Sequence, residues 1–298
     1  MLEQGASAPG AYPDDLRGIA DAYLEELSFP GADAVPGLVE AMRYSLLAGG
    51  KRIRPVLAMA TAEALGGEAS DVLPFSASVE MIHTYSLIHD DLPAMDDDDF
   101  RRGMPTLHKE RNEAVAILAG DCLYAEAFAH LLTHQSGSPE AVSAAAAELA
   151  RATGVDGMVG GQFIDVEEIV GPGIAGLELL HGLKTGRLIR ASADCVNLLM
   201  GIQGEKANAI RGFSSELGVL FQIVDDILDV TGSDSDLGKP AGSDERQGKR
   251  TFVTEVGLDG ARQLAAERHS SALSCLASMG DEATRLRAIA DHVWTRSS

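Results

Sequence analysis

The sequence has few cysteines and no recognisable targeting segment. Its three cysteines, Cys122, Cys195 and Cys275, are odd in number and stand far apart in apolar or alanine-rich surroundings. They predict reduced, buried thiols in a cytoplasmic protein and exclude a disulfide framework. The N-terminus has no basic segment followed by an apolar run, and no stretch is expected to be long enough to span a bilayer. We expect a soluble protein without membrane insertion.

Positive charge is also scarce. The 298 residues include 24 Lys and Arg against 45 Asp and Glu, which gives a net charge of −21. Nucleic acid would be repelled by most of such a surface, so a nucleic-acid partner is excluded. An anionic small molecule would need local clusters of Lys and Arg. With 45% hydrophobic residues the chain can bury one large core, so we expect a single domain over 1–298, with 1–12 as a flexible tail.

Alternating runs of Ile, Val and Thr, which are typical of strands, are missing, whereas apolar residues recur at helical spacing. Asp14 or Asp15 is expected to cap the first helix, and Pro36 to open a helix that Gly49 and Gly50 end. Further helices are expected over 71–89, 114–132, 139–152 and 177–200. The alanine-rich segment 114–132 is a candidate for helix or subunit packing. The fold class is therefore all-α, a helix bundle with its cavity between helices.

The densest motif is HDDLPAMDDDDFRRGMPT, from His89 to Thr106. It places six carboxylates between Asp90 and Asp99, followed by Arg101 and Arg102. A solvated acidic turn is the ordinary interpretation of such a run. However, the run follows an apolar helix, so its first aspartates lie at the edge of a core. Carboxylates there favour Mg²⁺ that also carries phosphates, and arginine pairs with phosphate oxygens. The motif indicates a diphosphate site.

A second acidic cluster lies within GVLFQIVDDILDV. The i, i+4 spacing places Asp225 and Asp229 one above the other on a helix face, with Asp226 further around the helix. No Lys or Arg stands between Arg211 and Lys239, so ion pairs along the helix do not explain these acids. Buried carboxylates without partners are costly, which favours metal ligation.

Three shorter motifs have both an ordinary and a functional interpretation. The segment 51–55, KRIRP, is a solvated turn or a diphosphate cradle at a helix start, and the cradle is favoured. Gln162 and Asp165 near the GGQ motif are either ordinary polar residues of a helix or part of a site, and both interpretations stay open. Lys184 in an apolar helix would usually reach solvent, but Gly186 permits a local break that frees backbone carbonyls.

Together these motifs resemble the trans-isoprenyl diphosphate synthases, and most closely the bacterial-type farnesyl diphosphate synthases. The matching segments are YSLLAGGKRIRPVL (44–57), HTYSLIHDDLPAMDDDDFRRGMPT (83–106), GGQ (160–162), KTG (184–186), FQIVDDILDV (221–230) and LGK (237–239). They stand in the family's order and span most of the chain. The resemblance implies a single-domain helix bundle of the isoprenoid synthase type with a central cavity, assembled as a homodimer.

The resemblance also implies the reaction. An allylic diphosphate, dimethylallyl or geranyl, ionises; the double bond of isopentenyl diphosphate attacks the cation; and a proton is lost, with the departing pyrophosphate as the base. No covalent nucleophile is needed, and the sequence has no recognisable Ser-His or Cys-His signature.

Roles for single residues follow from the same resemblance. Mg²⁺, three ions with substrate bound, is expected on Asp90, Asp91, Asp96, Asp225, Asp226 and Asp229, the last two of these through water. The catalytic set at the allylic diphosphate and its cation is Arg101, Lys184, Thr185, Gln222 and Lys239. The isopentenyl diphosphate pocket is expected to comprise Lys51, Arg54, His83 and Arg102. Lys249 binds substrate from the loop 231–249, which departs from the family pattern at Pro240.

Product length is expected to depend on Tyr85 and Ser86, which precede Asp90 by about one helical turn. Taken alone, Tyr85 is one more core aromatic. In the family a bulky aromatic here, with the inserted pair Pro93 and Ala94, marks enzymes that stop at fifteen carbons. Farnesyl diphosphate is therefore the expected product and geranylgeranyl diphosphate the alternative.

Three other classes of protein share part of this pattern. A metal-dependent phosphohydrolase is suggested by His83 and the pair His89-Asp90, but that class needs more histidine ligands. A terpene cyclase would not need the basic elements for a second diphosphate. A non-catalytic subunit would carry one degraded acidic motif, and both motifs are intact.

Overall fold

The computed structural model describes residues 12–232 and 249–295. The expected N-terminal tail therefore lies almost entirely outside the described residues, as do Lys239, Pro240 and most of the loop 231–249. The helices are α1 (Asp14–Glu26), α2 (Pro36–Leu46), α3 (Ile53–Ala64), α4 (Leu73–Asp90), α5 (Leu107–Glu110), α6 (Glu113–His134), α7 (Pro139–Thr153), α8 (Met158–Val166), α9 (Gly173–His181), α10 (Arg187–Leu199), α11 (Glu205–Thr231), α14 (Phe252–Cys275) and α15 (Thr284–Thr295). Short 3₁₀ turns cover Ala32–Ala34, Ala69–Val72 and Ala277–Ala283, and a π turn covers Gly182–Gly186.

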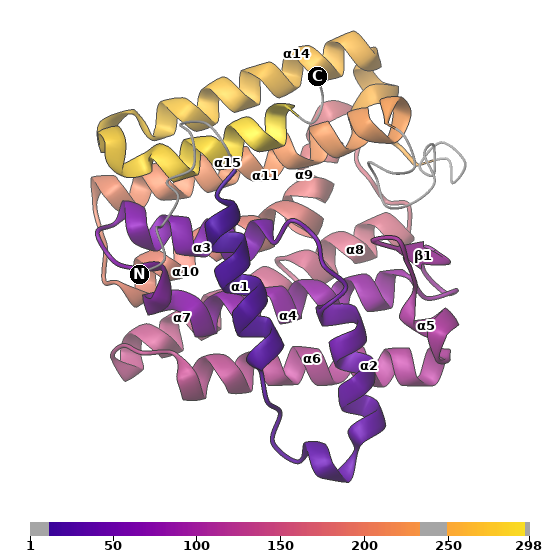
Figure 1. Ribbon diagram of the computed structural model, residues 1–298. Coiled ribbons are helices and arrows are strands. Elements are labelled where there is room, and N and C mark those ends of the chain that lie inside the picture. Colours follow the sequence, from indigo (N-terminus) through magenta and orange to yellow (C-terminus); the bar gives the residue numbers. More distant parts are fainter. Residues whose placement is uncertain (1–11, 233–248, 296–298) are drawn as a thin grey trace.

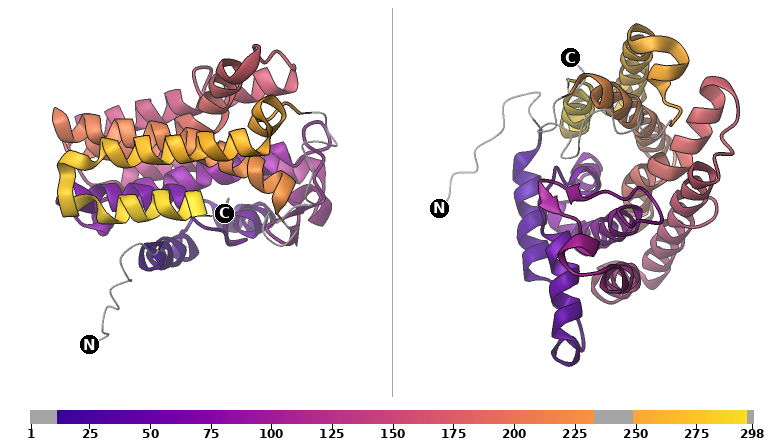
Figure 2. Two further views of the ribbon diagram at one scale, coloured as in Figure 1. Left: turned by 90° about the horizontal axis from the view of Figure 1, so that it is seen from above. Right: turned by 90° about the vertical axis from the view of Figure 1, so that its right-hand side faces the viewer.

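The long helices form one bundle, which α1 and α2 cross on one face (Figure 1). Viewed along the long helices, α1 and α2 lie on one side of the bundle and α14 and α15 lie at its top (Figure 2, right). The main pairings are α11 with α14, α4 with α6, and α10 with α7 and α11. Helix α3 is buried along nearly its whole length. The all-α class expected from the sequence is confirmed, with one core that includes the fully buried rings of Phe75, Phe213 and Phe252.

Several helix starts follow from local sequence. Asn112 caps α6 by accepting a hydrogen bond from the Val115 amide at 2.9 Å, and Ser138 caps α7 by accepting from the Ala141 amide at 3.1 Å. Both satisfy backbone donors that a helix start leaves free. The expected cap of α1 was wrong. Asp14 is already helical and the N-cap is Pro13, so the acid contributes through the helix dipole and not as a cap.

Helix boundaries for 71–89, 114–132 and 139–152 agree with the expectations to within two residues. The segment 177–200 is divided by the π turn, so the break expected at Lys184 to Gly186 is confirmed. The absence of strands was not confirmed. Phe100–Arg101 (β1) pairs antiparallel with Met104–Pro105 (β2), and the turn between them has positive φ at Arg102 and Gly103. Strands of two residues are too short to show an alternating pattern in the sequence.

Helix α6 has the length and composition of a membrane span. It is the one such helix among residues 12–232 and 249–295; it has 22 residues, and the mean hydropathy over an 18-residue window of it is 1.5. The expectation that no stretch is long enough was therefore wrong. One face of α6 packs along α4, and Asp121 and Glu126 lie within the helix. A bundle helix meets the same description, so α6 is weak evidence for a span.

Two glycines allow close backbone packing around the π turn. A Cβ atom on Gly161 of α8 would lie 2.3 Å from the Lys184 amide nitrogen. A Cβ atom on Gly218 of α11 would lie 2.9 Å from the Gly186 Cα. In both places the obstructing atom is backbone, which cannot rotate away as a side chain can. The π turn is therefore held between α8 and α11 because both helices present a residue without a side chain.

Gly161→Ala should lower the free energy of unfolding by about 1–3 kcal/mol, because overpacking must displace backbone. The control is Gly18→Ala, an exposed position in α1 with no atom within 4 Å of the added Cβ. That change should raise stability by about 0.5–1 kcal/mol, since alanine favours helix more than glycine does. Urea unfolding of both variants measures the difference. Equal and small effects at the two sites would contradict close packing at Gly161.

Candidate active site

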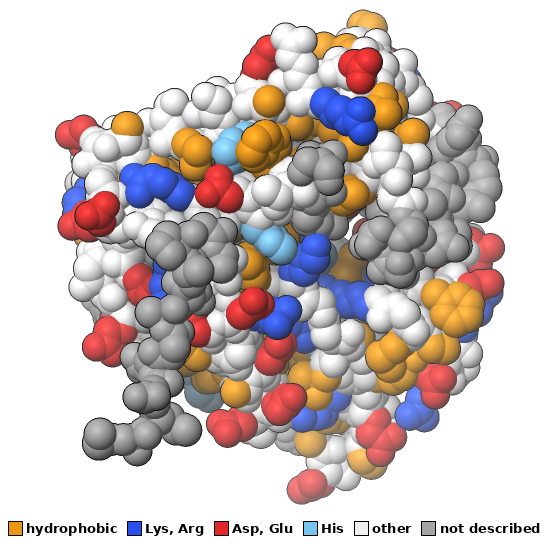
Figure 3. Space-filling model, turned by 45° about the horizontal axis from the view of Figure 1, so that its top comes forward, with side chains coloured by type: hydrophobic (Ala, Val, Ile, Leu, Met, Phe, Trp, Pro, Cys, Tyr) orange, Lys and Arg blue, Asp and Glu red, His pale blue; other side chains and the backbone are white. Residues whose placement is uncertain are grey.

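A cleft of about 550 Å³ opens among α4, α8, the π turn and α11. Figure 3 shows basic and histidine side chains gathered in a hollow on one face of the molecule. The expected site residues that line the cleft are Arg54, His83, Tyr85, Ser86, Asp90, Asp96, Arg101, Lys184, Thr185, Gln222, Asp225, Asp226 and Lys249. Segments that are far apart in the sequence therefore meet at one cavity.

The first acidic motif is shaped by its backbone. Asp90 ends α4, and the following loop turns back so that the Asp96 amide donates to the Asp90 carbonyl at 2.8 Å. This turn brings both carboxylates to the cleft. Burial is the main cause that raises the pKa of Asp90, Lys184 opposes the rise and the neighbouring Asp96 adds to it, and the pKa that results is about 6. The ammonium group of Lys249 donates to Asp96 Oδ1 at 2.9 Å. Burial alone would raise the pKa of Asp96, but Lys249 and Lys184 outweigh it and lower that pKa.

The Asp91 carboxylate, unlike those of Asp90 and Asp96, is not brought to the cleft. Its side chain is 5% exposed, and Oδ1 accepts from Arg101 Nε at 2.8 Å and from Nη2 at 2.6 Å. Asp91 is not among the described residues that line the cleft. The expected metal ligand is thus a carboxylate that holds Arg101, which Asp98 also contacts at 2.9 Å.

The second acidic motif divides in the same way. Asp225 and Asp226 line the cleft, whereas Asp229 is buried one turn further along α11 and does not. Asp226 Oδ1 accepts from Gln222 Nε2, and Oδ2 accepts from the Phe252 amide at the start of α14, each at 2.8 Å. The i, i+4 expectation for Asp225 and Asp229 was therefore correct as helix geometry but not as a shared position at the cleft.

The π turn presents Lys184 and Thr185 to the same space. Lys184 Nζ donates to Asp165 Oδ2 at 2.6 Å. Thr185 Oγ1 donates to Gln222 Oε1 at 3.2 Å, and Gln222 in turn donates to Asp226. This chain of hydrogen bonds fixes which end of the Gln222 amide faces the π turn, and it leaves the amide oxygen on the Thr185 side.

A basic wall faces these acids. Arg54 and His83 line it. Burial lowers the pKa of Arg54 to about 10, and its Nε is buried without a partner. Burial also lowers the pKa of His83 well below its usual value, and Arg54 and Arg102 lower it further. His83 is therefore neutral at neutral pH.

The other two residues expected in this pocket lie beside it. Arg102 Nη1 donates to the Gly49 carbonyl at 2.6 Å, and the guanidinium packs against Gly50. The Lys51 carbonyl accepts from the Tyr12 hydroxyl at 2.6 Å. Neither Arg102 nor Lys51 is among the described residues that line the cleft. The sequence placed both in a basic motif, but hairpin and turn geometry decide where their side chains go.

Further polar residues that line the cleft include Gln162, Asp165, His181 and Arg250. The sequence left the first two undecided and missed the others. Burial lowers the pKa of His181 to about 4, with Lys184 lowering it further, and its Nε2 has no partner. The sequence signal that could have identified His181 as a cleft residue was its position three residues before Lys184, on the same helical face. Arg250 Nη1 donates to the Gly171 carbonyl at 2.8 Å.

The carboxylates suit ions that are shared with a diphosphate. In the described part of the chain, no group of three or more His, Cys, Asp or Glu side chains could hold a metal by itself. The cleft instead has two pairs, Asp90 with Asp96 and Asp225 with Asp226. Mg²⁺ is commonly held by one or two carboxylates together with substrate phosphates. The donor set fits that mode and does not fit the histidine-rich metal pair of the rival phosphohydrolase.

An aromatic cluster reaches the cleft through Tyr85. Tyr85 is 8% exposed, and its ring lies 5.0 Å from that of Tyr124, edge to face. Tyr124 in turn lies 5.2 Å from Phe128. Ser86 also lines the cleft, and its hydroxyl donates to the His83 carbonyl at 2.9 Å. Tyr85 thus separates the cleft from two further aromatic rings on α6.

Comparisons with known proteins identify the family of the chain. Residues 35–287 match the family model described as polyprenyl synthetase. The chain is 45% identical over 267 residues to the Arabidopsis thaliana heterodimeric geranylgeranyl pyrophosphate synthase large subunit 1, covering 87% of this chain and 72% of the relative. It is 45% identical over 263 residues to the Catharanthus roseus geranylgeranyl pyrophosphate synthase, covering 87% and 74%.

Two solved structures share the fold. An apo FPP/GFPP synthase from Zymomonas mobilis is 35% identical with a TM-score of 0.82, covering 94% of this chain and 96% of that one. A geranyltransferase from Helicobacter pylori, complexed with magnesium and isoprenyl diphosphate, is 30% identical with a TM-score of 0.84, covering 98% of each chain. Since the family model spans most of the chain and these relatives match nearly all of it, the protein belongs to the polyprenyl synthetase family.

Proposed function

We propose that this prenyltransferase condenses isopentenyl diphosphate with dimethylallyl or geranyl diphosphate and that its main product is farnesyl diphosphate. The observation that carries the proposal is the arrangement of one cleft. Two pairs of carboxylates, a separate arginine and histidine wall, and an aromatic cluster all border the same cavity. Two diphosphates and one growing hydrocarbon chain need these three kinds of surface.

Different residues of the cleft bind the two substrates. Asp90, Asp96, Asp225 and Asp226 would hold the Mg²⁺ ions, which we expect to number three. When bound there, the ions would neutralise the charge that grows on the leaving diphosphate. Asp91 and Asp229, which do not line the cleft, support these four carboxylates from behind. Arg101 and Lys184 bind the allylic diphosphate, with Lys239 and Lys249 as further cations from the loop before α14. Charge complementarity of this kind stabilises the transition state of bond breaking.

The oxygens around the π turn face the cation. The Thr185 hydroxyl and the Gln222 amide oxygen are held 3.2 Å apart and offer partial negative charge without a nucleophile that could capture the cation. Arg54 and neutral His83 bind the second diphosphate, that of isopentenyl diphosphate, with Arg102 and Lys51 beside them. Separate walls for the two diphosphates place the double bond of one substrate next to the allylic carbon of the other.

Geranylgeranyl diphosphate is the second candidate product. It is favoured by the names of the curated relatives at 45% identity. The farnesyl product is supported by the bulk of Tyr85 at the cleft and by the FPP/GFPP synthase among the structural neighbours. A non-catalytic subunit is disfavoured because the cleft retains carboxylates from both acidic motifs. A cytoplasmic location, expected from the cysteines, stays a prediction.

Asp90→Ala and Asp225→Ala should each lower turnover by about a hundredfold or more, because each removes charge stabilisation of the transition state. Steady-state assays with Mg²⁺, isopentenyl diphosphate and geranyl diphosphate measure the effect. Asp259→Ala is the control, since Asp259 is fully exposed on α14. If either cleft variant keeps an unchanged Tm and near-normal turnover, the metal assignment is wrong.

Tyr85→Ala should shift the products towards twenty carbons or longer, because it opens the space in front of Tyr124. It should also cost about 3 kcal/mol of stability through lost aromatic burial. Chromatography of the dephosphorylated products measures chain length. Tyr23→Ala is the control: Tyr23 is a half-buried ring on α1 that contacts His130 and does not line the cleft. An unchanged distribution in Tyr85→Ala would place the length limit elsewhere, with Tyr124 and Phe128 the next residues to truncate.

We also propose that the chain forms a homodimer through α6, the helix that the sequence suggested for subunit packing. The outer side of α6 exposes Ile117, Leu118 and Leu132, each 44–57% accessible. Exposed apolar side chains along one long helix favour burial against a second copy. Leu118→Glu should convert dimer to monomer in sedimentation velocity, whereas Ile19→Glu, at an exposed position on α1, should not. A wild-type monomer would contradict this arrangement.

A further inference from the structure

A buried carboxylate lies behind the basic wall of the cleft. Glu80 belongs to α4, three residues before His83, and its side chain is 1% exposed. Arg52 Nη1 donates to Glu80 Oε1 at 2.6 Å, and Arg102 Nη2 lies 3.7 Å from the same oxygen. One carboxylate oxygen therefore faces guanidinium groups from two segments, the turn before α3 and the β1–β2 hairpin.

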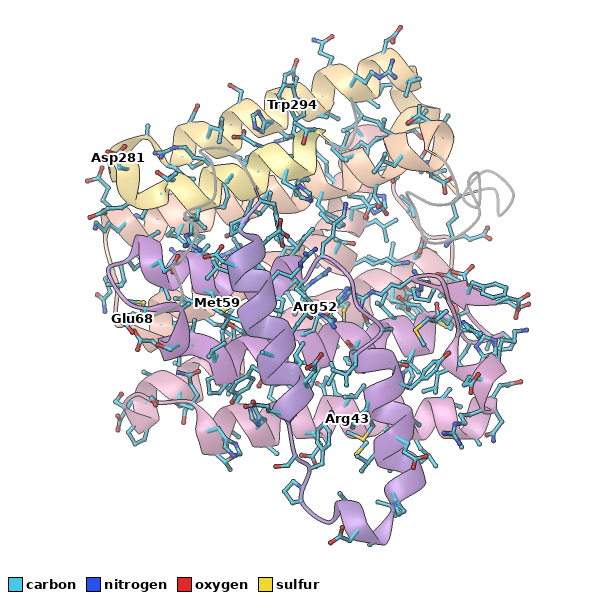
Figure 4. All side chains as sticks on the ribbon, viewed as in Figure 1. Arg43, Arg52, Met59, Glu68, Asp281 and Trp294 are labelled. Carbon is cyan, nitrogen blue, oxygen red and sulfur yellow. The ribbon has the colours of Figure 1, made fainter. Side chains whose placement is uncertain are left out.

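Arg52 serves Glu80 and not the cleft. Nε donates to Asp21 on α1 and Nη2 donates to the Leu46 carbonyl on α2, each at 2.8 Å. With Glu80 on α4, these bonds place Arg52 where α1, α2 and α4 meet, as the labelled side chain in Figure 4 shows. Its backbone has φ of +51°, a conformation that non-glycine residues seldom adopt. The fold accepts this strain and directs the side chain inward, so Arg52 fixes the position of Glu80.

Arg54, which lines the cleft, and Arg102, which lies beside it, both interact with that carboxylate. Arg102 contacts it directly, with 3.7 Å between Nη2 and Oε1. Burial lowers the pKa of Arg54, the charge of Glu80 opposes this, and the charge of Arg102 adds to it. The charge of Glu80 therefore offsets the repulsion between Arg54 and Arg102. Arg101 is held separately by Asp91 and Asp98. The two arginines of the hairpin thus have different acidic partners. Arg101 pairs with Asp91 and Asp98, whereas Arg102 pairs with Glu80.

We propose that Glu80, anchored by Arg52, is a positioning residue that orients Arg54 and Arg102 for the diphosphate of isopentenyl diphosphate. The inference rests on the proposed function, in which these arginines hold the second substrate. Glu80 does not line the cleft and is not expected to touch substrate. Its removal should therefore weaken one substrate selectively. The allylic diphosphate would be spared, because Arg101 and Lys184 have their own acidic partners, Asp91 and Asp165.

The test measures the KM of each substrate and kcat for Glu80→Gln. Loss of one charge-assisted contact is expected to raise the KM of isopentenyl diphosphate about tenfold, with a much smaller change in the allylic KM. Arg54→Ala should show the same selectivity and serves as the reference. Calorimetric titration with isopentenyl diphosphate should show the same loss of affinity without turnover. Glu80→Asp keeps the charge but withdraws it from Arg102, so it should give a smaller shift of the same kind.

Asp194→Asn is the matched control. Asp194 is also buried, 7% exposed at the side chain, and is paired with Arg190 and Arg211, but it does not line the cleft. This variant should lose stability without a selective change in either KM. A Glu80→Gln enzyme whose two KM values rise equally, or whose Tm alone falls, overturns the inference. If Glu80→Gln does not fold, Glu80→Asp decides by the same criterion.

Failure of the proposed function gives a different result. A wild-type chain that neither binds isopentenyl diphosphate nor transfers a prenyl group refutes that function and this inference together. A wild-type chain that is active, with a Glu80→Gln variant that keeps normal selectivity, refutes the role of Glu80 alone.

Discussion

The cleft depends on pairing between partly buried charges of opposite sign that come from different elements. Asp91 holds Arg101, Asp165 holds Lys184, and Asp96 holds Lys249, with shortest distances of 2.6–2.9 Å. Such ion pairs are weak evidence for stability, because desolvation and solvent screening offset much of the attraction between the charges. Their value here is geometric. Each pair keeps a cation at the cleft in a protein whose net charge is −21, where cations would otherwise be drawn towards many competing acids.

The π turn is the second constraint, and it connects the backbone to the chemistry. Such turns shift the hydrogen-bonding pattern within a helix and often occur at functional sites. Gly161 and Gly218 let α8 and α11 approach the turn from two sides, so its position is set by close packing and not by side-chain contacts alone. Lys184 and Thr185 then point to the cleft from a rigid segment. A rigid set of oxygens and cations needs little rearrangement when charge develops during the reaction.

Much of this arrangement could be predicted from the sequence. Helical periodicity gave most of α4, α6 and α7, and the spacing of the acids indicated two clusters at one site. The differences between the expected and the observed placement of side chains have a common cause. Periodicity states which residues share a helix face, but not which neighbour that face meets. Asp91 and Asp229 therefore seemed equivalent to Asp90 and Asp225, although each lies away from the cleft. The β1–β2 hairpin, which redirects Arg102, was too short to leave a pattern.

Product length is a second property that the sequence alone predicts only in part. Tyr85 stands one turn before the first acidic motif, and this can be read from the sequence. The two rings behind it, Tyr124 and Phe128, come from α6, about forty residues later in the chain. If three rings from two helices together bound the space for the prenyl chain, its depth depends on their contact and not on Tyr85 alone. Identity of 45% to a geranylgeranyl pyrophosphate synthase subunit is an average over 267 residues. It carries little information about one aromatic stack, so relatives with the same cleft and chemistry can differ in the length of the chain they release.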